Sequence, residues 1–79
     1  MKVRIEVFGF LKNHIPLKFK GHSSEFSIEN SAPLYYLLNE MLLLGNFDKI
    51  VLVNGRYVAP SYCLKQGDIV QIFSPIAGG

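Results

Sequence analysis

The residues best suited to chemistry stand at the C-terminal end of the sequence, which reads Ser74-Pro75-Ile76-Ala77-Gly78-Gly79. Glycine has no Cβ, so the last two residues can enter a narrow channel and adopt any backbone conformation there. An α-carboxylate ordinarily has a pKa of about 3.5, so Gly79 is expected to end in an anion, which is a poor electrophile unless something activates it. The alternative is a frayed terminus, because chain ends are commonly poorly ordered.

The residues before the two glycines are suited to carry them away from a folded body. Pro75 fixes its own φ at about −65° and favours an extended chain. Residues 74–79 can span about 20 Å at roughly 3.3–3.6 Å per residue, which is enough to reach a buried site in a partner. We therefore expect one domain over residues 1–73 and a flexible tail over residues 74–79.

Other reactive side chains are few. Cys63 is the only cysteine, which excludes an internal disulfide and a multi-cysteine metal site, and we expect it to be a small buried or half-buried residue. A free thiol suits a reducing compartment, so the expected location is cytoplasmic. His14 and His22 have no carboxylate or cysteine at a recognisable metal-ligand spacing, so we expect surface residues and no metal.

The size and charge of the chain narrow the function further. Its 79 residues are enough for one domain but not for a nucleotide cleft together with a substrate pocket, so an autonomous enzyme is not expected. The net charge is only +2, and the basic residues between Lys12 and His22 alternate with Leu17 and Phe19 as on a solvated strand face. The pattern therefore does not indicate nucleic-acid binding. Purely aliphatic runs such as residues 41–44 are far too short for a membrane span.

The first thirty residues predict extended structure. Residues 2–8 alternate strictly, with Val3, Ile5 and Val7 on one face, as in a half-buried strand. Residues 17–20 alternate in the same way and suggest a hairpin with the first strand. Residues 21–30 are polar with two apolar positions and form a candidate short extended piece.

One helix is predicted over residues 33–44. Ser31 could cap it, and Pro33 stands in its first turn, where a missing N–H costs nothing. Tyr35 and Tyr36 are expected to frame the core, and Gly45 to end the helix. The apolar stripe follows helical spacing: Leu34, Leu37, Leu38, Met41 and Leu42.

The remaining residues predict strands around two turns. Residues 50–53 form a short continuous apolar run, typical of a strand covered on both faces. Asn54-Gly55 is a strong hairpin signal, with residues 56–59 as the return strand. Residues 66–68 turn the chain into a last strand over residues 69–73. One helix on one face of a mixed sheet of four to five strands gives a two-layer α+β domain.

The order of elements and three segments resemble the small sulfur-carrier proteins, which have the ubiquitin-like β-grasp fold. These segments are Val-Asn-Gly at 53–55, Leu-Lys-Gln-Gly-Asp-x-Val at 64–70 and Phe-Ser-Pro-Ile-Ala-Gly-Gly at 73–79. The family includes the small subunit of molybdopterin synthase and the thiamine-biosynthesis sulfur carrier. The opening at 7–12 and Pro75 favour the molybdopterin type, although Ser74 stands where that type commonly has a first proline.

The resemblance implies an activity for Gly79. A ubiquitin-activating-type enzyme would adenylate its carboxylate with ATP, and a sulfur donor would convert the adenylate into a thiocarboxylate. The tail would then enter the large subunit of molybdopterin synthase and deliver sulfur. The chain itself would bind no cofactor and would act as a non-catalytic subunit. Three alternatives remain: thiamine thiazole synthesis or another sulfur-using pathway, protein modification through an isopeptide bond, and an interaction module with an inert tail.

A docking surface is also expected. By strand alternation, Phe8 and Phe73 fall on the polar side of the sheet, and Tyr57 flanks an inward valine. In the family, hydrophobic residues at matching positions contact the activating enzyme and the synthase large subunit. The alternative is that these aromatic rings fold back over the edge of the sheet.

Overall fold

The computed structural model describes residues 1–9, 23–28, 31–42, 44 and 48–74. The predicted strand over residues 17–20, both histidines, the expected helix stop at Gly45 and the tail beyond Ser74 lie outside these ranges.

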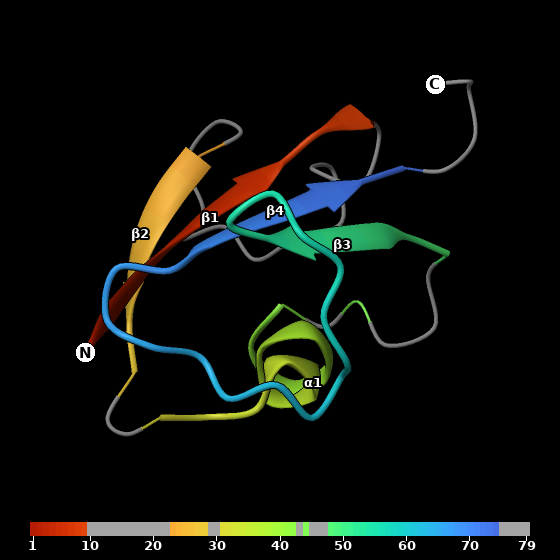
Figure 1. The fold of residues 1–79 in the computed structure, drawn as a ribbon. Coiled ribbons are helices and arrows are strands. Elements are labelled where there is room, and N and C mark those ends of the chain that lie inside the picture. The colour runs from red at the N-terminus through yellow and green to blue at the C-terminus, as the bar shows by residue number, and fades with distance from the viewer. Residues whose placement is uncertain (10–22, 29–30, 43, 45–47, 75–79) are drawn as a thin grey trace.

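The described residues form a mixed sheet with a helical segment on one face (Figure 1). The strands are β1 (Lys2–Val7), β2 (Ser23–Ser27), β3 (Ile50–Val53) and β4 (Ile69–Phe73). The sheet order is β2-β1-β4-β3, with β1 and β4 parallel at the centre and the outer strands antiparallel to them. The predicted α+β class and first and last strands are confirmed, and the extended piece predicted within residues 21–30 is β2.

The core lies between the sheet and the helical segment. β1 and β4 each bury every second side chain, as strand alternation predicts. Leu34, Leu37 and Leu38 of the helix meet them from the other layer. The fully buried strand side chains are Val3, Ile5, Val7, Val70 and Ile72.

The start of the helix differs from the expectation for Ser31. The helix α1 (Leu34–Tyr36) begins after Pro33 without any side-chain cap. Its first free N–H groups are bound by backbone carbonyls instead: Leu34 N–H donates to Tyr62 O (2.8 Å) and Tyr35 N–H to Pro60 O (3.0 Å). The Ser31 hydroxyl donates to Leu64 O, 2.8 Å away. The chain after β3 thus satisfies the donors that a capping side chain would otherwise satisfy.

The end of the helix also differs, because it stops before residue 44. From Leu37 to Met41 the chain forms a wider π-helical turn, η2, and Leu42 N–H donates to Leu37 O at 2.9 Å. Leu42 and Leu44 are both completely buried. Residues two apart point about 200° from each other on an α-helix, so both can be buried only if the chain leaves helical geometry. Of the predicted apolar stripe, Leu34, Leu37, Leu38 and Leu42 are buried as expected, and the predicted helix length is too long.

The predicted return strand over residues 56–59 is wrong. Asn54 and Gly55 both have positive φ, 54° and 81°, as the hairpin turn requires. Only Arg56 pairs back with Val53, in an isolated bridge. The chain then turns away from the sheet, because its carbonyls bind the start of the helix, and the antiparallel partner of β3 is β4.

A buried carboxylate ties this connection to the sheet. Asp68 is only 6% exposed and accepts three hydrogen bonds of 2.9 Å, from Asn54 Nδ2, the Tyr62 hydroxyl and Lys65 N–H. Asn54 Oδ1 in turn accepts Ile69 N–H at 2.9 Å. The same five residues therefore join the turn after β3, the long connection and the start of β4.

These contacts set the charge state of Asp68. Burial alone would raise the pKa of its carboxyl, but the donors from Lys65, Asn54 and Tyr62 outweigh it and hold the pKa below its usual value. The bond to the carboxylate also raises the pKa of Tyr62. Because the pKa of Asp68 is lower in the folded than in the unfolded chain, its contribution to stability is complete above about pH 4 and is lost as the pH falls through the folded value.

Replacing this carboxylate tests its role. We expect Asp68→Ala to lower the free energy of unfolding by about 1–3 kcal/mol near neutral pH, since it leaves buried donors without an acceptor. The difference from the wild type should shrink as the pH falls through the lowered pKa of the folded carboxyl, because the wild-type carboxylate then becomes protonated. Urea denaturation at a series of pH values measures both effects. Asp48→Ala, which removes an exposed carboxylate, is the control; an equal loss in both variants, or a pH-independent loss in Asp68→Ala, would contradict the assignment.

Candidate functional site

The face of the sheet opposite the helix has two halves of different character. Strand pairing places Ile50 beside Phe73 and Leu52 beside Gln71, so the β3–β4 half is largely apolar. Ile50 and Leu52 are half-buried rather than covered, which corrects the prediction of a strand buried on both faces. Ile69, which pairs with Arg4, is 37% exposed on the same face. No described element covers this apolar half.

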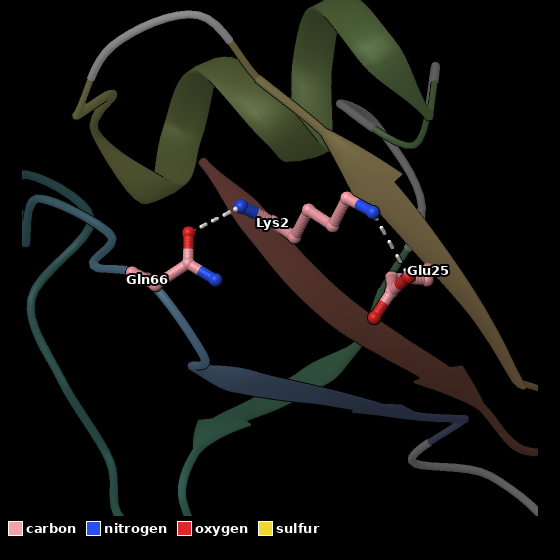
Figure 2. A network of polar contacts seen from close by, with 3 residues as sticks. All are labelled: Lys2, Glu25 and Gln66. Atoms are coloured by element: carbon pink, nitrogen blue, oxygen red, sulfur yellow. Dashed lines mark hydrogen bonds and ion pairs between the residues drawn. The ribbon is translucent and has the colours of Figure 1, made fainter.

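The β1–β2 half carries charge. Figure 2 shows Lys2 of β1 between Glu25 of β2 and Gln66 of the turn before β4. Lys2 N–H donates to Gln66 Oε1 (2.8 Å), and its ammonium lies 3.9 Å from Glu25 Oε1. Both charged side chains are more than half exposed, so the pair adds little stability. This half, out to the edge strand β2, is therefore a solvated face.

The apolar half ends in two stacked rings. Phe8 and Phe73 lie with their ring centroids 4.8 Å apart and their planes at 13°. Phe8 directly follows β1 and donates its N–H to Ile72 O at 2.8 Å, while Phe73 is the last residue of β4. Two of the three predicted interface residues therefore meet, at the point where the chain passes from β4 into Ser74.

Tyr57 lies elsewhere. It is 76% exposed and lines a groove of about 400 Å³ between the helical segment and β3, on the side where Val51 packs towards the core. The groove's lining includes neither Phe8 nor Phe73. The structure thus joins the two phenylalanines and places Tyr57 on a separate surface. The lining residues are Leu34, Tyr35, Leu38, Asn39, Lys49, Val51, Tyr57, Val58 and Pro60.

The same side of the molecule corrects the expectation for the helix tyrosines. Tyr35 and Tyr36 are 51% and 44% exposed and do not frame the core. Lys49, at the edge of the groove, donates from Nζ to Leu44 O at 2.8 Å. Burial lowers the pKa of this ammonium, and the nearby Asp48 carboxylate partly opposes the shift.

Cys63 is exposed, so the prediction that it is buried or half-buried is wrong. Its backbone forms an isolated bridge with Pro33, and its neighbour Leu64 takes the inward position at 0% exposure. The thiol lies 3.7 Å from Ser61 O. Within the described ranges, no group of three His, Cys, Asp or Glu side chains could hold a metal ion. No helix in these ranges is long and apolar enough to cross a membrane.

Of the tail, the structure describes Ser74; the predicted insertion residues Pro75, Ile76, Ala77, Gly78 and Gly79 lie outside the described ranges. Ser74 Oγ is buried and has no hydrogen-bond partner among the described residues. Gly9 lies against it. Gly9 and Asp68 were considered from the sequence only as members of the opening, the turn and the resembling segments, and neither was given a role of its own, although a glycine directly after a strand and an acid closing a turn were the available signals.

Solved structures share this architecture. SAMP1 from Haloferax volcanii superposes with a TM-score of 0.73 at 19% identity, over 100% of both chains. A Pyrococcus furiosus protein described as molybdopterin converting factor, subunit 1, superposes with a TM-score of 0.74 at 24% identity, over 95% of this chain and 98% of that one. The fold is therefore the ubiquitin-like β-grasp, as the order of elements predicted.

Comparison of the sequence with protein families places the chain in a narrower group than its fold alone does. No curated protein matches the sequence. The family model that does match covers residues 13–79, which is more than half of the chain and includes both glycines of the tail. The chain belongs to the ThiS family, a family of sulfur carriers.

Proposed function

We propose that this chain carries sulfur as a thiocarboxylate on Gly79 and delivers it in molybdopterin synthesis, as the small subunit of a two-subunit synthase. The observation that carries the proposal is the match to the ThiS family through Gly79. Two features support it: an apolar half-face without a described cover, and a tail that starts at the edge of that half-face. Similarity to a molybdopterin converting factor subunit favours this pathway over others.

The chemistry needs two substitutions, the first at the α-phosphorus of ATP and the second at the carbonyl carbon of Gly79. An oxygen of the Gly79 carboxylate attacks the α-phosphorus of ATP and releases pyrophosphate, which turns a poor electrophile into an acyl-adenylate. A hydrosulfide equivalent from a sulfur donor then attacks the carbonyl carbon and expels AMP. The product, a C-terminal thiocarboxylate, is itself a nucleophile. The adenylating partner supplies ATP and the stabilisation of the developing charge, and this chain supplies the reacting group.

The sheet supports docking while the tail reaches inwards. The stacked pair of Phe8 and Phe73 continues into Ile50, Leu52 and Ile69, so an apolar surface begins where the tail leaves. Exposed apolar surface of this kind commonly marks a protein interface. A partner that binds here would hold the globular body outside its active site and admit only the tail.

The mass of the intact protein tests the chemistry. Incubation with ATP, the adenylating enzyme of the same organism and a sulfur donor should raise the mass by the exchange of one oxygen for sulfur. A variant lacking Gly78 and Gly79 should show no change, because the carboxylate it presents is on a residue with a side chain. An unchanged wild-type mass with active partners would contradict the proposal. A lysine-linked conjugate in place of the thiocarboxylate would identify a protein modifier instead.

Binding tests the docking surface. We expect Phe73→Ala to weaken binding to the adenylating enzyme at least tenfold, because buried aromatic anchors contribute more than about 1.4 kcal/mol at interfaces. Tyr36→Ala is the matched control, since Tyr36 is an exposed aromatic residue on the helix side. Calorimetric titration measures both affinities, and circular dichroism confirms that both variants fold. Equal affinities of the two variants for the adenylating enzyme would show that Phe73 is not part of the interface. Capture of a thiazole synthase in place of a molybdopterin synthase large subunit would show that the sulfur goes to thiamine thiazole synthesis instead.

A further inference from the structure

The place where the tail begins is set by two strands that end together. β1 and β4 are parallel, and Val7 pairs with Ile72, so both strands leave the sheet at the same end. Phe8 and Phe73 follow and stack on each other. The next residues, Gly9 and Ser74, are therefore brought against one another.

Their contact is too close for any side chain at position 9. A Cβ on Gly9 would lie 2.9 Å from Ser74 Cβ and 3.8 Å from both Ser74 N and Oγ. Cβ atoms essentially never lie within 3.0 Å of a heavy atom from another part of the chain. Ser74 Cβ is attached directly to the main chain, so relief of the clash requires the backbone of Ser74 or Gly9 to move. Gly9 also has a φ of +77°, which disfavours other residues.

Ser74 is held by this packing rather than by polar contacts of its side chain. Its Oγ is buried and has no hydrogen-bond partner among the described residues. Phe73, directly before it, is fixed by the ladder with β3 and by the ring of Phe8. A displacement at Ser74 would therefore be passed on to the tail residues that follow it rather than to the sheet.

We propose that Gly9 is a positioning residue that sets the direction in which the tail leaves the sheet, by allowing Ser74 to pack directly on the backbone. Gly9 does not touch the reacting carboxylate and acts only through Ser74. This inference rests on the proposed function for its effect on activation, but its effect on the tail's direction is independent of that function.

The first experiment measures direction alone. A nitroxide on Cys63, which is exposed and is the only cysteine, broadens the amide signals of nearby residues in NMR spectra. In Gly9→Ala, the broadening of the Gly78 and Gly79 signals should change by at least twofold relative to wild type. Gly55→Ala is the matched control, because Gly55 has a similar φ of +81° but nothing within 4 Å of an added Cβ. The same broadening pattern in Gly9→Ala and wild type would overturn the inference.

Relief of the clash provides the second arm. The double variant Gly9→Ala/Ser74→Gly removes the opposing Cβ, so it should restore the wild-type pattern while retaining the backbone cost at position 9. If Gly9→Ala does not fold, Ser74→Val crowds the same contact and leaves Gly9 unchanged; it should then alter the pattern. A double variant as altered as Gly9→Ala, or an unaltered Ser74→Val, would contradict a steric role.

Activation gives the third readout. In ATP–pyrophosphate exchange with the adenylating enzyme, Gly9→Ala should lower kcat/KM at least tenfold, Gly55→Ala should stay within about twofold of wild type, and the double variant should recover. A tail that is redirected without loss of exchange would show that its direction does not matter for activation. If wild type itself supports no exchange while the NMR difference persists, the proposed function fails and the positioning role stands.

Discussion

The structure depends most on the parallel pairing of β1 with β4 at the centre of the sheet. Each strand buries alternate side chains against the helix, and neither has another way to cover them. Their register makes both strands end at the same end of the sheet. Residues far apart in sequence are thereby brought together, Phe8 with Phe73 and Gly9 with Ser74. The stacked rings and the point at which the chain leaves β4 are therefore consequences of one pairing.

A second constraint acts at the opposite end of β4. There the Asp68 carboxylate accepts hydrogen bonds from Asn54 in the turn after β3, from Tyr62 and from Lys65. The connection between β3 and β4 has little regular structure of its own, yet its carbonyls also hold the start of the helix. Buried polar groups are stable only when they are satisfied, so the carboxylate and these carbonyls fix a connection that apolar packing alone would leave loose. A carrier that presents one end of a strand to a partner benefits from a rigid anchor at the other.

Much of this was predictable from the sequence because it depends on local pattern. Period-two alternation located β1 and β4, Asn54-Gly55 located a turn with positive φ, and helical spacing identified the buried leucines. The errors arose where a distant segment decided the outcome. The cap expected at Ser31 was replaced by carbonyls of Pro60 and Tyr62, and the return strand after Arg56 was lost because that segment serves the helix.

The candidate site shows the same division. Alternation was enough to place Phe8 and Phe73 on the open face. Only the strand register brings the two rings together and Gly9 against Ser74, and only the packed structure shows that Tyr57 lines a separate groove. The apolar run at residues 50–53 was interpreted as a strand covered on both faces, whereas Ile50 and Leu52 lie on the half-face that we assign to a partner. A continuous apolar run in a small sheet can therefore indicate binding as well as burial.

The central claim is that the carboxylate of Gly79 is the working group and that the folded body presents it. The most direct measurement is the molybdenum-cofactor content of cells in which the chromosomal gene encodes one additional alanine after Gly79. The account predicts that these cells contain as little molybdenum cofactor as a strain from which the gene is deleted. The added residue replaces the glycine carboxylate with an amide, while the fold and the proposed docking surface are unchanged. A cofactor content equal to that of wild-type cells, with the extension confirmed intact by mass, would contradict it.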